Sequence, residues 1–516
     1  MERGPQVIEQ TRYDLLVIGG GINGAGIARD AAGRGLSVLL CEQDDLASHT
    51  SSSSTKLIHG GLRYLEYKEF GLVRKALQER ETLLRAAPHI IWPLRFVMPH
   101  MPNLRPAWLI RLGLFLYDHL AKRELLPGSR GITMRRHAAG APLVDSIRRG
   151  FVYSDGWVDD ARLVVLNALD ARERGAEILT RTRLTAASRD GDTWLARLQR
   201  PDGSSVEVRA RAIANAAGPW VGSLLHGALG REARHSVRLV KGSHIVTPRL
   251  FDHDHAYIFQ NPDKRIIFAI PYEQDYTLIG TTDVEYHDDP SKVAIDGDET
   301  QYLCDSINRY FKQKISPADV RWTYSGVRPL LEDENADNPS AVTRDYRLEM
   351  DDGPGAPLLS VFGGKITTFR KLAEDATGML CDALASRAAA WTAGQPLPGG
   401  DIADARFAPF AQDFAKRHAW LPAALARRYA RAYGTRAERV IAGATSLAGL
   451  GAAVAPGLYE AELRYLREVE WATCADDVLW RRSKLGLHVA PGTLEAVTAA
   501  LDGWFANTRA AVHAAH

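Results

Sequence analysis

One segment, Tyr13–Glu42, constrains the fold of this chain more than any other. It reads YDLLVIGGGINGAGIARDAAGRGLSVLLCE and begins with a short apolar strand over 15–18. The strand runs into a turn with the spacing G-x-G-x-x-G at Gly19, Gly21 and Gly24, and a helix and a second strand follow. Strand, glycines, helix and strand in this register within about 30 residues are typical of a dinucleotide-binding βαβ unit.

Each glycine of this turn has its own steric role. Gly19 permits a tight turn, Gly21 lets a pyrophosphate approach the backbone, and Gly24 lets the helix pack close to the strand. The helix that we expect to begin near Ile22 directs its N-terminal amides at the phosphates. The second strand leads to Glu42, whose carboxylate can accept hydrogen bonds from an adenosine ribose without a 2′-phosphate.

This pattern predicts one tightly held dinucleotide. The unit starts twelve residues into the chain, a placement that is common in flavoproteins and favours FAD over NAD. A second fingerprint is absent, because the nearest imitation, at Gly449 and Gly451, has Val454 where the third glycine would stand.

Length and composition limit the other classes of function. A chain of 516 residues predicts about three domains. The formal net charge of +2 gives no basic footprint, so we expect no nucleic-acid partner. The four cysteines are far apart and show no metal-ligand spacing, so we expect buried thiols in a reducing cytosol and no metal site. No secretory leader and no stretch of about 20 apolar residues occurs, which predicts a cytoplasmic protein.

An amphipathic segment over 106–123 reads PAWLIRLGLFLYDHLAKR. At about 100° per residue its charged residues form a narrow stripe, and leucines fill the opposite side with Trp108 towards the edge. Two interpretations are open. The helix can lie in a membrane interface, where tryptophan and basic residues favour the headgroups, or it can be an ordinary helix packed on the cap of the active site.

Several loops beyond the βαβ unit are candidates for contact with the cofactor. The polar run over 48–66 resembles a flexible linker in composition, but it follows the ribose-binding acid directly and ends in paired glycines, which favours a loop facing the cofactor. Strands that run into glycine turns recur at NAAGPWV over 215–221 and at SVFGGKITTFR over 360–370. From these stretches we select as cofactor-binding residues Ser53, Ser54, His59, Gly60, Gly61, Gly218 and Gly364.

The order of patterns along the chain predicts three domains. Strand-rich sequence over 236–345 indicates an antiparallel substrate domain, and helical patterns dominate the end of the chain. We expect a discontinuous nucleotide-binding α/β domain, an antiparallel cap and an all-helical C-terminal domain. The ranges are 11–80, 153–220 and 345–390 for the first, 81–152 and 221–344 for the second, and 400–516 for the third.

Nine motifs carry a family resemblance. VIGGGINGAGIARDAAGRGLSVLLCE, TKLIHGGLRYLE, YSDGWVDDARLV, VKGSHIV, IGTTDVEY, WTYSGVRPL, TRDY, VFGGKITTFRKLAE and CADDVLWRRSKLGL occur in this order, and together they cover nearly the whole chain. In these motifs the chain resembles the aerobic, FAD-dependent glycerol-3-phosphate dehydrogenases. The resemblance implies a Rossmann-like fold of the D-amino-acid-oxidase class. It also implies oxidation of sn-glycerol 3-phosphate to dihydroxyacetone phosphate at the membrane surface, with electrons passed to quinone.

The resemblance also implies roles for residues outside the glycine turn. Arg328 and Arg344 match the family's phosphate-binding arginines, and Arg63 and Tyr64 resemble residues that line its substrate pocket. Lys365 matches a lysine that contacts the substrate beside flavin N5.

Two threonines and one histidine complete the set of candidate residues. Thr367 and Thr368 follow Lys365 and would lie near the flavin pyrimidine ring. His244 is a candidate general base, although a structural hydrogen-bonding role stays open. The catalytic residues that we predict are therefore Lys365, His244 and Arg328.

Two further points remain open from the residues alone. Oxygen could replace quinone as the electron acceptor, which would make the enzyme a glycerol-3-phosphate oxidase. From another class of protein, the alternative is a flavoprotein whose FAD is structural or sensory. As partners we expect glycerol 3-phosphate, membrane quinone and an anionic lipid surface at the inner face of the cytoplasmic membrane, with a possible homodimer.

Overall fold

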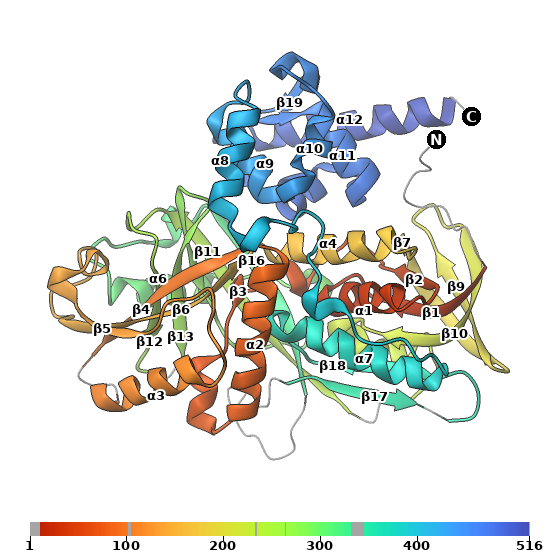
Figure 1. The fold of residues 1–516 in the computed structure, drawn as a ribbon, viewed down its shortest axis with the longest axis horizontal. Helices are drawn as coiled ribbons and strands as arrows, with labels where there is room; N and C mark the ends of the chain where they lie inside the picture. The colour runs from red at the N-terminus through yellow and green to blue at the C-terminus, as the bar shows by residue number, and fades with distance from the viewer. Residues whose placement is uncertain are drawn as a thin grey trace.

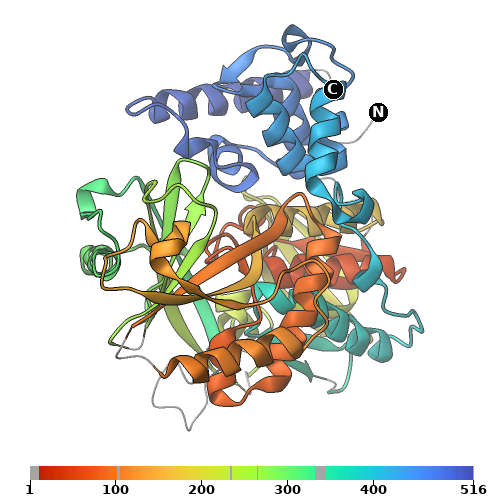
Figure 2. The same cartoon turned by 60° about the vertical axis from the view of Figure 1, so that its left-hand side comes forward.

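The computed structural model describes residues 11–101, 105–232, 235–263, 265–331, 345–351 and 353–514. These residues form a central sheet covered by helices, a second sheet beside it, and a helical domain that lies over the central sheet (Figure 1). The turned view in Figure 2 shows the helical domain as a separate body above the other two.

The central sheet has eight strands and a parallel core. β1 (Arg12–Ile18) pairs in parallel with β2 (Val38–Cys41) and β10 (Ser205–Asn215). The parallel core continues through β7 (Glu177–Leu179) and β18 (Leu358–Phe362), and antiparallel strands complete the sheet: β8 (Arg183–Asp190), β9 (Thr193–Gln199) and β17 (Arg347–Asp351). The expected first strand, glycine turn and helix start are confirmed, since α1 begins at Ile22.

Alternation along β1 explains how the central sheet is covered. Leu15 and Val17 point into a core made with α1 (Ile22–Gly33), α4 (Asp160–Glu173) and α7 (Phe369–Ala383). Leu16 and Ile18 point to the other face, where β8, β9 and α5 (Val221–His226) pack. Because successive side chains of a strand face opposite sides, a strand that is apolar throughout must be covered on both faces.

The cap sheet has ten strands and carries the second large core. Neighbouring strands of this sheet pair in antiparallel fashion, except β12 and β4, which are parallel. The strands are β3 (Leu57–Ile58), β4 (Ile91–His100), β5 (Arg130–Thr133), β6 (Arg149–Val158), β11 (Val237–Pro248), β12 (Ala256–Gln260), β13 (Ile266–Tyr272), β14 (Tyr276–Gly280), β15 (Val284–Glu285) and β16 (Trp322–Leu331). The helices on this side are α2 (Phe70–Ala86), α3 (Ala107–His119) and α6 (Gly297–Asn308).

At two places the sheets differ from the domain ranges that the sequence predicts. β3 lies within 11–80 but pairs with β6 of the cap sheet, and β6 runs across the expected boundary at 153. Both strands lie where the chain passes between the sheets. A two-residue strand such as β3 has no periodicity of its own, so composition could not assign it to a sheet.

The C-terminal domain has its own apolar core, built around Phe414, Tyr429 and Leu463. Its helices are α8 (Phe407–Arg417), α9 (Ala423–Tyr433), α10 (Ala437–Ile441), α11 (Glu460–Glu470) and α12 (Leu494–Ala514), with a π-helical turn over Asp477–Arg482. One detail corrects the all-helical expectation, because β19 (Ala453–Ala455) and β20 (Leu458–Tyr459) form a small hairpin. The intervening Pro-Gly pair is a turn signal that explains it. Among the described residues, none of the helices combines the length and the apolar character needed to cross a bilayer.

Candidate active site

A cavity of about 670 Å³ lies between the central sheet and the cap sheet. From the central sheet, the ends of β1, β2, β10 and β18 line it with Ile18, Gly19, Gly21, Cys41, Glu42, Ala216, Gly218, Gly363 and Gly364. From the cap sheet, β11, β13 and β16 contribute Gly242, His244, Phe268, Gly326 and Arg328. Ligands of such α/β sheets bind at the carboxyl ends of the parallel strands, which is where this cavity opens.

The glycine turn forms one wall of the cavity. Gly19 has φ of +109°, and a Cβ atom there would lie 2.6 Å from the Ala216 carbonyl oxygen. A Cβ atom on Gly24 would lie 1.9 Å from the Gly19 carbonyl oxygen, so only glycine lets α1 approach β1 this closely. Gly21 faces the cavity, and Gly24 supports the turn from within α1. The structure agrees with the steric roles expected for Gly19 and Gly24, and the approach of a pyrophosphate to Gly21 stays a prediction.

Glu42 joins the glycine turn to the loop that follows β2. Its Oε2 accepts a hydrogen bond from the Gly20 amide at 2.6 Å, and its Oε1 accepts one from the Asp44 amide at 2.8 Å. Burial raises the pKa of the Glu42 carboxyl, and the two amides act in the opposite direction. The carboxylate therefore lies against the backbone of the turn, at the position expected for a ribose-binding acid.

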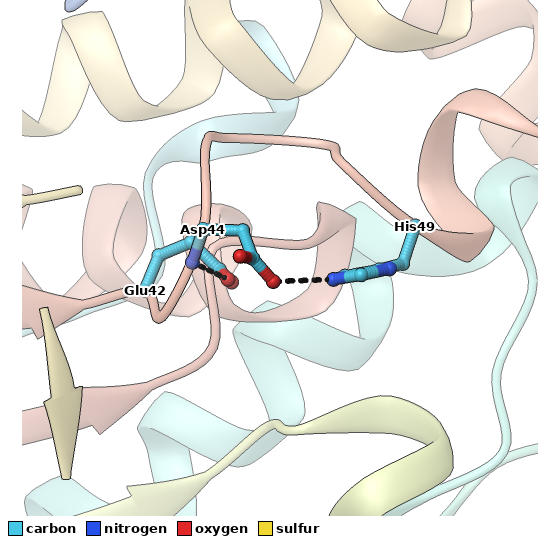
Figure 3. A group of neighbouring side chains, drawn as sticks. All are labelled: Glu42, Asp44 and His49. Carbon is cyan, nitrogen blue, oxygen red and sulfur yellow. Dashed lines mark hydrogen bonds and ion pairs between the residues drawn. The ribbon is translucent and has the colours of Figure 1, made fainter. Parts of the chain in front are cut away.

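Glu42, Asp44 and His49 form a close cluster, which Figure 3 draws. His49 Nε2 lies 2.8 Å from Asp44 Oδ2, and the candidate ligand atoms of the three residues lie within 4.8 Å of one another. Both Glu42 oxygens already accept amide hydrogen bonds, and His49 pairs with Asp44. The neighbouring side chains and backbone thus account for the cluster without a metal ion.

The serine run forms an ordered wall of the cavity, with a short 3₁₀ turn over Thr50–Ser52. Ser51 Oγ accepts a hydrogen bond at 3.0 Å from the Ile22 amide, at the start of α1. Ser54 Oγ donates to Asp160 Oδ2 at 2.8 Å. Ser53 and Ser54 both line the cavity, as expected. The run is therefore a structured loop, and its hydrogen bonds connect it to both α1 and α4.

Only part of the segment His59–Tyr64 reaches the cavity. His59 and Tyr64 line it, and the His59 amide donates to Thr367 Oγ1 at 3.2 Å. Gly60 and Gly61, which we expected to bind the cofactor, do not line it. The Gly60 amide instead donates to the Tyr117 hydroxyl at 2.8 Å, on the side of α3.

Arg63 also lies off the cavity, although its neighbour Tyr64 lines it. Both residues belong to the 3₁₀ helix Leu62–Tyr67. In this helix, successive side chains point in different directions, and Gly61 precedes it in a left-handed conformation with φ of +74°. Arg63 is thus not part of the cavity wall, and its contact with the substrate stays a prediction.

Lys365 reaches the cavity beside Tyr64. The Lys365 Nζ atom lies 3.8 Å from the centroid of the Tyr64 ring, which is a cation–π contact. Lys365, Gly364 and Thr367 line the cavity. Thr368 is buried behind them and does not line it. The predicted lysine therefore extends from the end of β18 into the cavity with its head group against an aromatic face.

His244 is a buried wall residue of the cap. Its Nε2 lies 3.0 Å from Thr55 Oγ1, and its ring stacks on Tyr324 with centroids 4.7 Å apart. Burial lowers the pKa of His244 well below its usual range, and the charges of Lys56 and Arg328 lower it further. Its Nδ1 is buried without a hydrogen-bond partner within the described part of the chain. The imidazole is therefore neutral, with one ring nitrogen that a ligand could satisfy.

Arg328 projects from β16 into the cavity. Its Nη2 donates to the Thr282 carbonyl oxygen at 3.0 Å and forms an ion pair with Asp283. A Cβ atom on Gly242 would lie 2.3 Å from that same nitrogen, so the guanidinium occupies the space above a glycine. Arg344, the second expected phosphate ligand, lies outside the described residues.

The residues present fit a dinucleotide. The cavity volume is in the range of cofactor sites. Gly19 and Gly364 have positive φ angles where a side chain would clash. Two buried polar atoms, Asn23 Oδ1 and His244 Nδ1, have no partner within the described residues.

Sequence reasoning missed several wall residues, among them Asn23, Ser51 and Trp220. Asn23 Nδ2 donates to the Gly363 carbonyl oxygen at 3.2 Å and so ties α1 to the loop after β18. Asn23 stands in the variable part of the fingerprint, so no motif marked it. Ser51 lies in the serine run, where Ser53 and Ser54 carry the same hydroxyl group, so the sequence did not distinguish it from them.

Comparisons with known proteins agree with this geometry. A family model described as FAD dependent oxidoreductase matches residues 14–369, and a model described as the C-terminal domain of alpha-glycerophosphate oxidase matches residues 390–504. The chain is 57% identical to the glycerol-3-phosphate dehydrogenase of Pseudomonas aeruginosa, over 93% of each chain. It is 54% identical to the D-erythritol 1-phosphate dehydrogenase of Brucella abortus, over 97% of this chain and 99% of that protein.

A solved structure shows the same architecture. The glycerol-3-phosphate dehydrogenase of Bacillus halodurans, in complex with FAD, superposes with a TM-score of 0.79 at 27% sequence identity. The match covers 97% of this chain and 91% of that chain. The comparisons confirm the predicted fold class, and they confirm FAD as the cofactor.

Proposed function

Because this chain belongs to the family of FAD-dependent glycerol-3-phosphate dehydrogenases, we propose that it oxidises sn-glycerol 3-phosphate to dihydroxyacetone phosphate. One observation carries this proposal. A single cavity joins the glycine-rich nucleotide cradle to three groups that suit a phosphorylated alcohol, namely Arg328, Lys365 and His244. FAD, when bound, supplies the hydride acceptor, and the protein supplies binding, orientation and charge.

Arg328 is the group that we assign to the substrate phosphate. A phosphomonoester is a dianion, and a planar guanidinium binds it through bidentate, charge-assisted hydrogen bonds. Arg328 is about one quarter exposed, with 26% of its side chain accessible, so a ligand in the cavity can reach it. We propose the same role for Arg344.

Lys365 and His244 are the groups that we assign to the reacting hydroxyl. The ammonium of Lys365 stabilises negative charge as the hydroxyl loses its proton, because an oriented charge in a dry site acts more strongly than in water. His244 accepts that proton. Burial keeps its imidazole neutral at physiological pH, so an acceptor nitrogen is available. Burial also makes it a weak base, and Lys365 offsets this weakness by lowering the pKa of the bound hydroxyl.

D-Erythritol 1-phosphate is the second candidate substrate, because a relative named for it matches nearly the whole chain. Both compounds are polyol phosphates, so Arg328 would bind either one. Anaerobic mixing of the holoprotein with each compound decides between them, since the true substrate bleaches the flavin absorbance. We expect glycerol 3-phosphate to reduce the flavin at least about tenfold faster at equal concentration. The reverse order would assign the enzyme to erythritol phosphate, and no bleaching by either would remove the dehydrogenase function.

An exposed apolar surface supports the membrane part of the proposal. Trp108, Leu112, Phe115 and Leu116 on α3 are 68%, 47%, 49% and 37% exposed. Tyr67, from the 3₁₀ helix Leu62–Tyr67 that α3 contacts, and Phe70, at the start of α2, are each 43% exposed. We call these six residues the α3 patch. Monomeric soluble proteins rarely expose so many large apolar side chains together.

The other side of α3 is buried, as the interpretation of α3 as a helix packed on the cap requires. Leu114 and Tyr117 pack in the cap core, so α3 is attached to the cap on one side and open on the other. Arg105 and Lys122, with side chains 54% and 85% exposed, stand near its two ends. We propose that the α3 patch lies in an anionic lipid surface at the inner face of the cytoplasmic membrane.

Membrane quinone is the electron acceptor that we propose, because attachment through α3 would bring the cavity close to lipid-soluble acceptors. Oxygen is the competitor, since the C-terminal domain resembles that of an alpha-glycerophosphate oxidase. The test is turnover on quinone-loaded vesicles with simultaneous measurement of hydrogen peroxide. Stoichiometric peroxide with no quinone reduction would reject the quinone assignment.

A further inference from the structure

The C-terminal domain reaches the wall of the cofactor cavity through its π-helical turn, Asp477–Arg482. Arg482 donates from Nη1 to Asp45 Oδ2 at 2.5 Å and from Nη2 to Asp45 Oδ1 at 2.8 Å. Arg481 Nε donates to Asp45 Oδ2 at 2.8 Å. The side chains of Arg482 and Asp45 are 0% and 1% exposed, so this contact is completely buried. π-helical turns are rare and occur frequently at functional sites.

Asp45 belongs to the loop that carries Glu42, the predicted ribose-binding acid. Its amide donates to Ser48 Oγ at 3.0 Å, and the Ala47 amide donates to the Gly20 carbonyl oxygen at 3.1 Å. Within this loop Gln43, Ala47, Ser48 and His49 line the cavity. The loop therefore lies directly between the C-terminal domain and the nucleotide end of the cavity.

The backbone of this loop needs support from its surroundings. Ala47 has φ of +60°, a left-handed conformation that residues other than glycine rarely adopt. Such a conformation persists only where neighbouring contacts enforce it. The Gly20 carbonyl holds one side of the loop, and the two arginines hold Asp45 on the other.

A second set of ion pairs, centred on Asp477, joins the same π-helical turn to the nucleotide-binding domain. Arg181, after β7, donates to Asp477 at 2.8 Å, and its own amide donates to the Asp44 carbonyl oxygen at 2.6 Å. Asp477 also accepts from Arg481 at 2.6 Å. The carboxylates of Asp45 and Asp477 are thus surrounded by guanidinium groups from both domains, and each is held from more than one direction.

We propose that Arg482 is a positioning residue for FAD, which acts through Asp45 and holds the loop 43–49 in its FAD-binding conformation. The C-terminal domain is then part of the cofactor site, although none of its described residues lines the cavity. In Arg482→Met, Asp45 keeps Arg481 at 2.8 Å and Arg181 at 3.9 Å but loses the bidentate contact that fixes the orientation of its carboxylate. The loop 43–49 can then shift away from its FAD-binding conformation, and the site loses affinity for FAD.

A matched contact elsewhere separates positioning from simple domain attachment. Arg162 of α4 binds Glu470 at the end of α11, with Nη2 2.9 Å from Oε1. This pair also joins the two domains and is also buried, with exposures of 1% and 0%. Neither side chain lines the cavity or forms a hydrogen bond with the loop 43–49, although the backbone carbonyl of Glu470 accepts a hydrogen bond from Arg482 Nε at 3.0 Å. Arg162→Met is therefore the control for Arg482→Met.

The test measures FAD affinity of the full-length chain, independently of turnover. Deflavinated protein is titrated with FAD and followed by quenching of flavin fluorescence, with ADP as a competitor for the nucleotide end. We expect Arg482→Met and Asp45→Asn each to raise the Kd for FAD about tenfold or more, and to weaken ADP to a similar degree. Arg162→Met should lower the Tm but change the Kd by less than about twofold.

A double-mutant cycle decides whether Arg482 acts through Asp45. In the Asp45→Asn background, Arg482→Met should add less than about threefold to the Kd, because its partner charge is already gone. Fully additive effects would overturn the proposal, as would equal losses of FAD affinity in Arg162→Met and Arg482→Met. If Arg482→Met does not fold, Arg482→Lys and Asp45→Asn decide by the same criteria, and an unchanged Kd in both would overturn the proposal.

Discussion

Arg328 Nη2 lies 2.9 Å from Asp283 Oδ1, so the guanidinium that we assign to the substrate phosphate is already paired with a carboxylate. A dianion that enters the cavity competes with Asp283 for this group and is repelled by it. We therefore expect Asp283→Asn to lower the KM for glycerol 3-phosphate several-fold, with little effect on glycerol. Steady-state kinetics with both substrates measures this.

The companion variant is Arg328→Met. A charge-assisted hydrogen bond contributes about 1.5–3 kcal/mol, so kcat/KM for glycerol 3-phosphate should fall roughly tenfold to more than a hundredfold. Glycerol should lose almost nothing, because it never used the contact. Equal losses for the two substrates would show that Arg328 supports the fold of the cavity and does not read the phosphate.

Lys365 should affect flavin reduction whatever the substrate. Its ammonium lies at the cavity wall over Tyr64, so Lys365→Met removes a charge from the reacting end of the substrate. We expect slower anaerobic flavin reduction in rapid mixing, with both glycerol 3-phosphate and glycerol. Lys365→Arg keeps the charge and should recover part of the rate. Normal reduction in Lys365→Met would leave His244 as the main candidate for the chemistry.

Gly24→Ala should abolish FAD retention. The added Cβ atom would lie 1.9 Å from the Gly19 carbonyl oxygen and would push α1 away from β1. Flavin absorbance of the purified protein, relative to its absorbance at 280 nm, measures the loss. Gly222→Ala is the matched control, because this helical glycine of α5 has nothing within 4 Å of an added Cβ atom. Full flavin content in Gly24→Ala would contradict the steric role of this glycine.

The α3 patch should bind anionic vesicles, and high salt should weaken this binding. Trp108→Glu combined with Leu112→Glu places two charges where apolar side chains would insert, so the variant should stay with the soluble fraction in a flotation assay. Leu494→Glu, at an apolar residue of α12 that is 38% exposed, is the control and should float like the wild type. Equal flotation of all three proteins would show that α3 serves only the cap.

Acid should destabilise the protein through buried neutral histidines. Burial, aided by Arg162 and Arg431, lowers the pKa of His89 from 6.5 to about 3. Below pH 6.5 the unfolded chain binds a proton that the folded chain excludes, so stability is present above this pH and is lost as the pH falls towards 3. Between pH 7.5 and pH 5 this single group should cost about 2 kcal/mol.

The measurement is the urea midpoint as a function of pH, for the wild type and for His89→Gln. The variant should lose less stability on acidification. The slope of its unfolding free energy against pH should be smaller by the equivalent of about one bound proton. His253, whose pKa is lowered to about 4, supplies a second contribution that both proteins share. Identical pH dependence in the two proteins would exclude His89 as a source of acid lability.

How much of the site the sequence predicts depends on whether the contacts are local or distant in the chain. The glycine turn is a local structure, so spacing alone predicted the residues that form the turn, of which Gly19, Gly21 and Glu42 line the cavity. The segment 59–64 shows the limit, because Tyr64 lines the cavity and its neighbour Arg63 does not. A sequence motif selects consecutive residues without distinguishing among them. The direction of each side chain depends on the backbone turn to which it belongs.

The sequence by itself therefore determined the nucleotide-binding unit, because short-range periodicity and steric demands encode it, and the family resemblance of its motifs indicated the fold class and the FAD cofactor. The tertiary structure alone decided which distant groups meet. It placed Arg482 on Asp45, which lies 437 residues away in the chain, and Arg328 beside Asp283. Neither pair has a spacing that predicts it. Buried charges find partners wherever packing brings them together, and only the folded chain specifies that geometry.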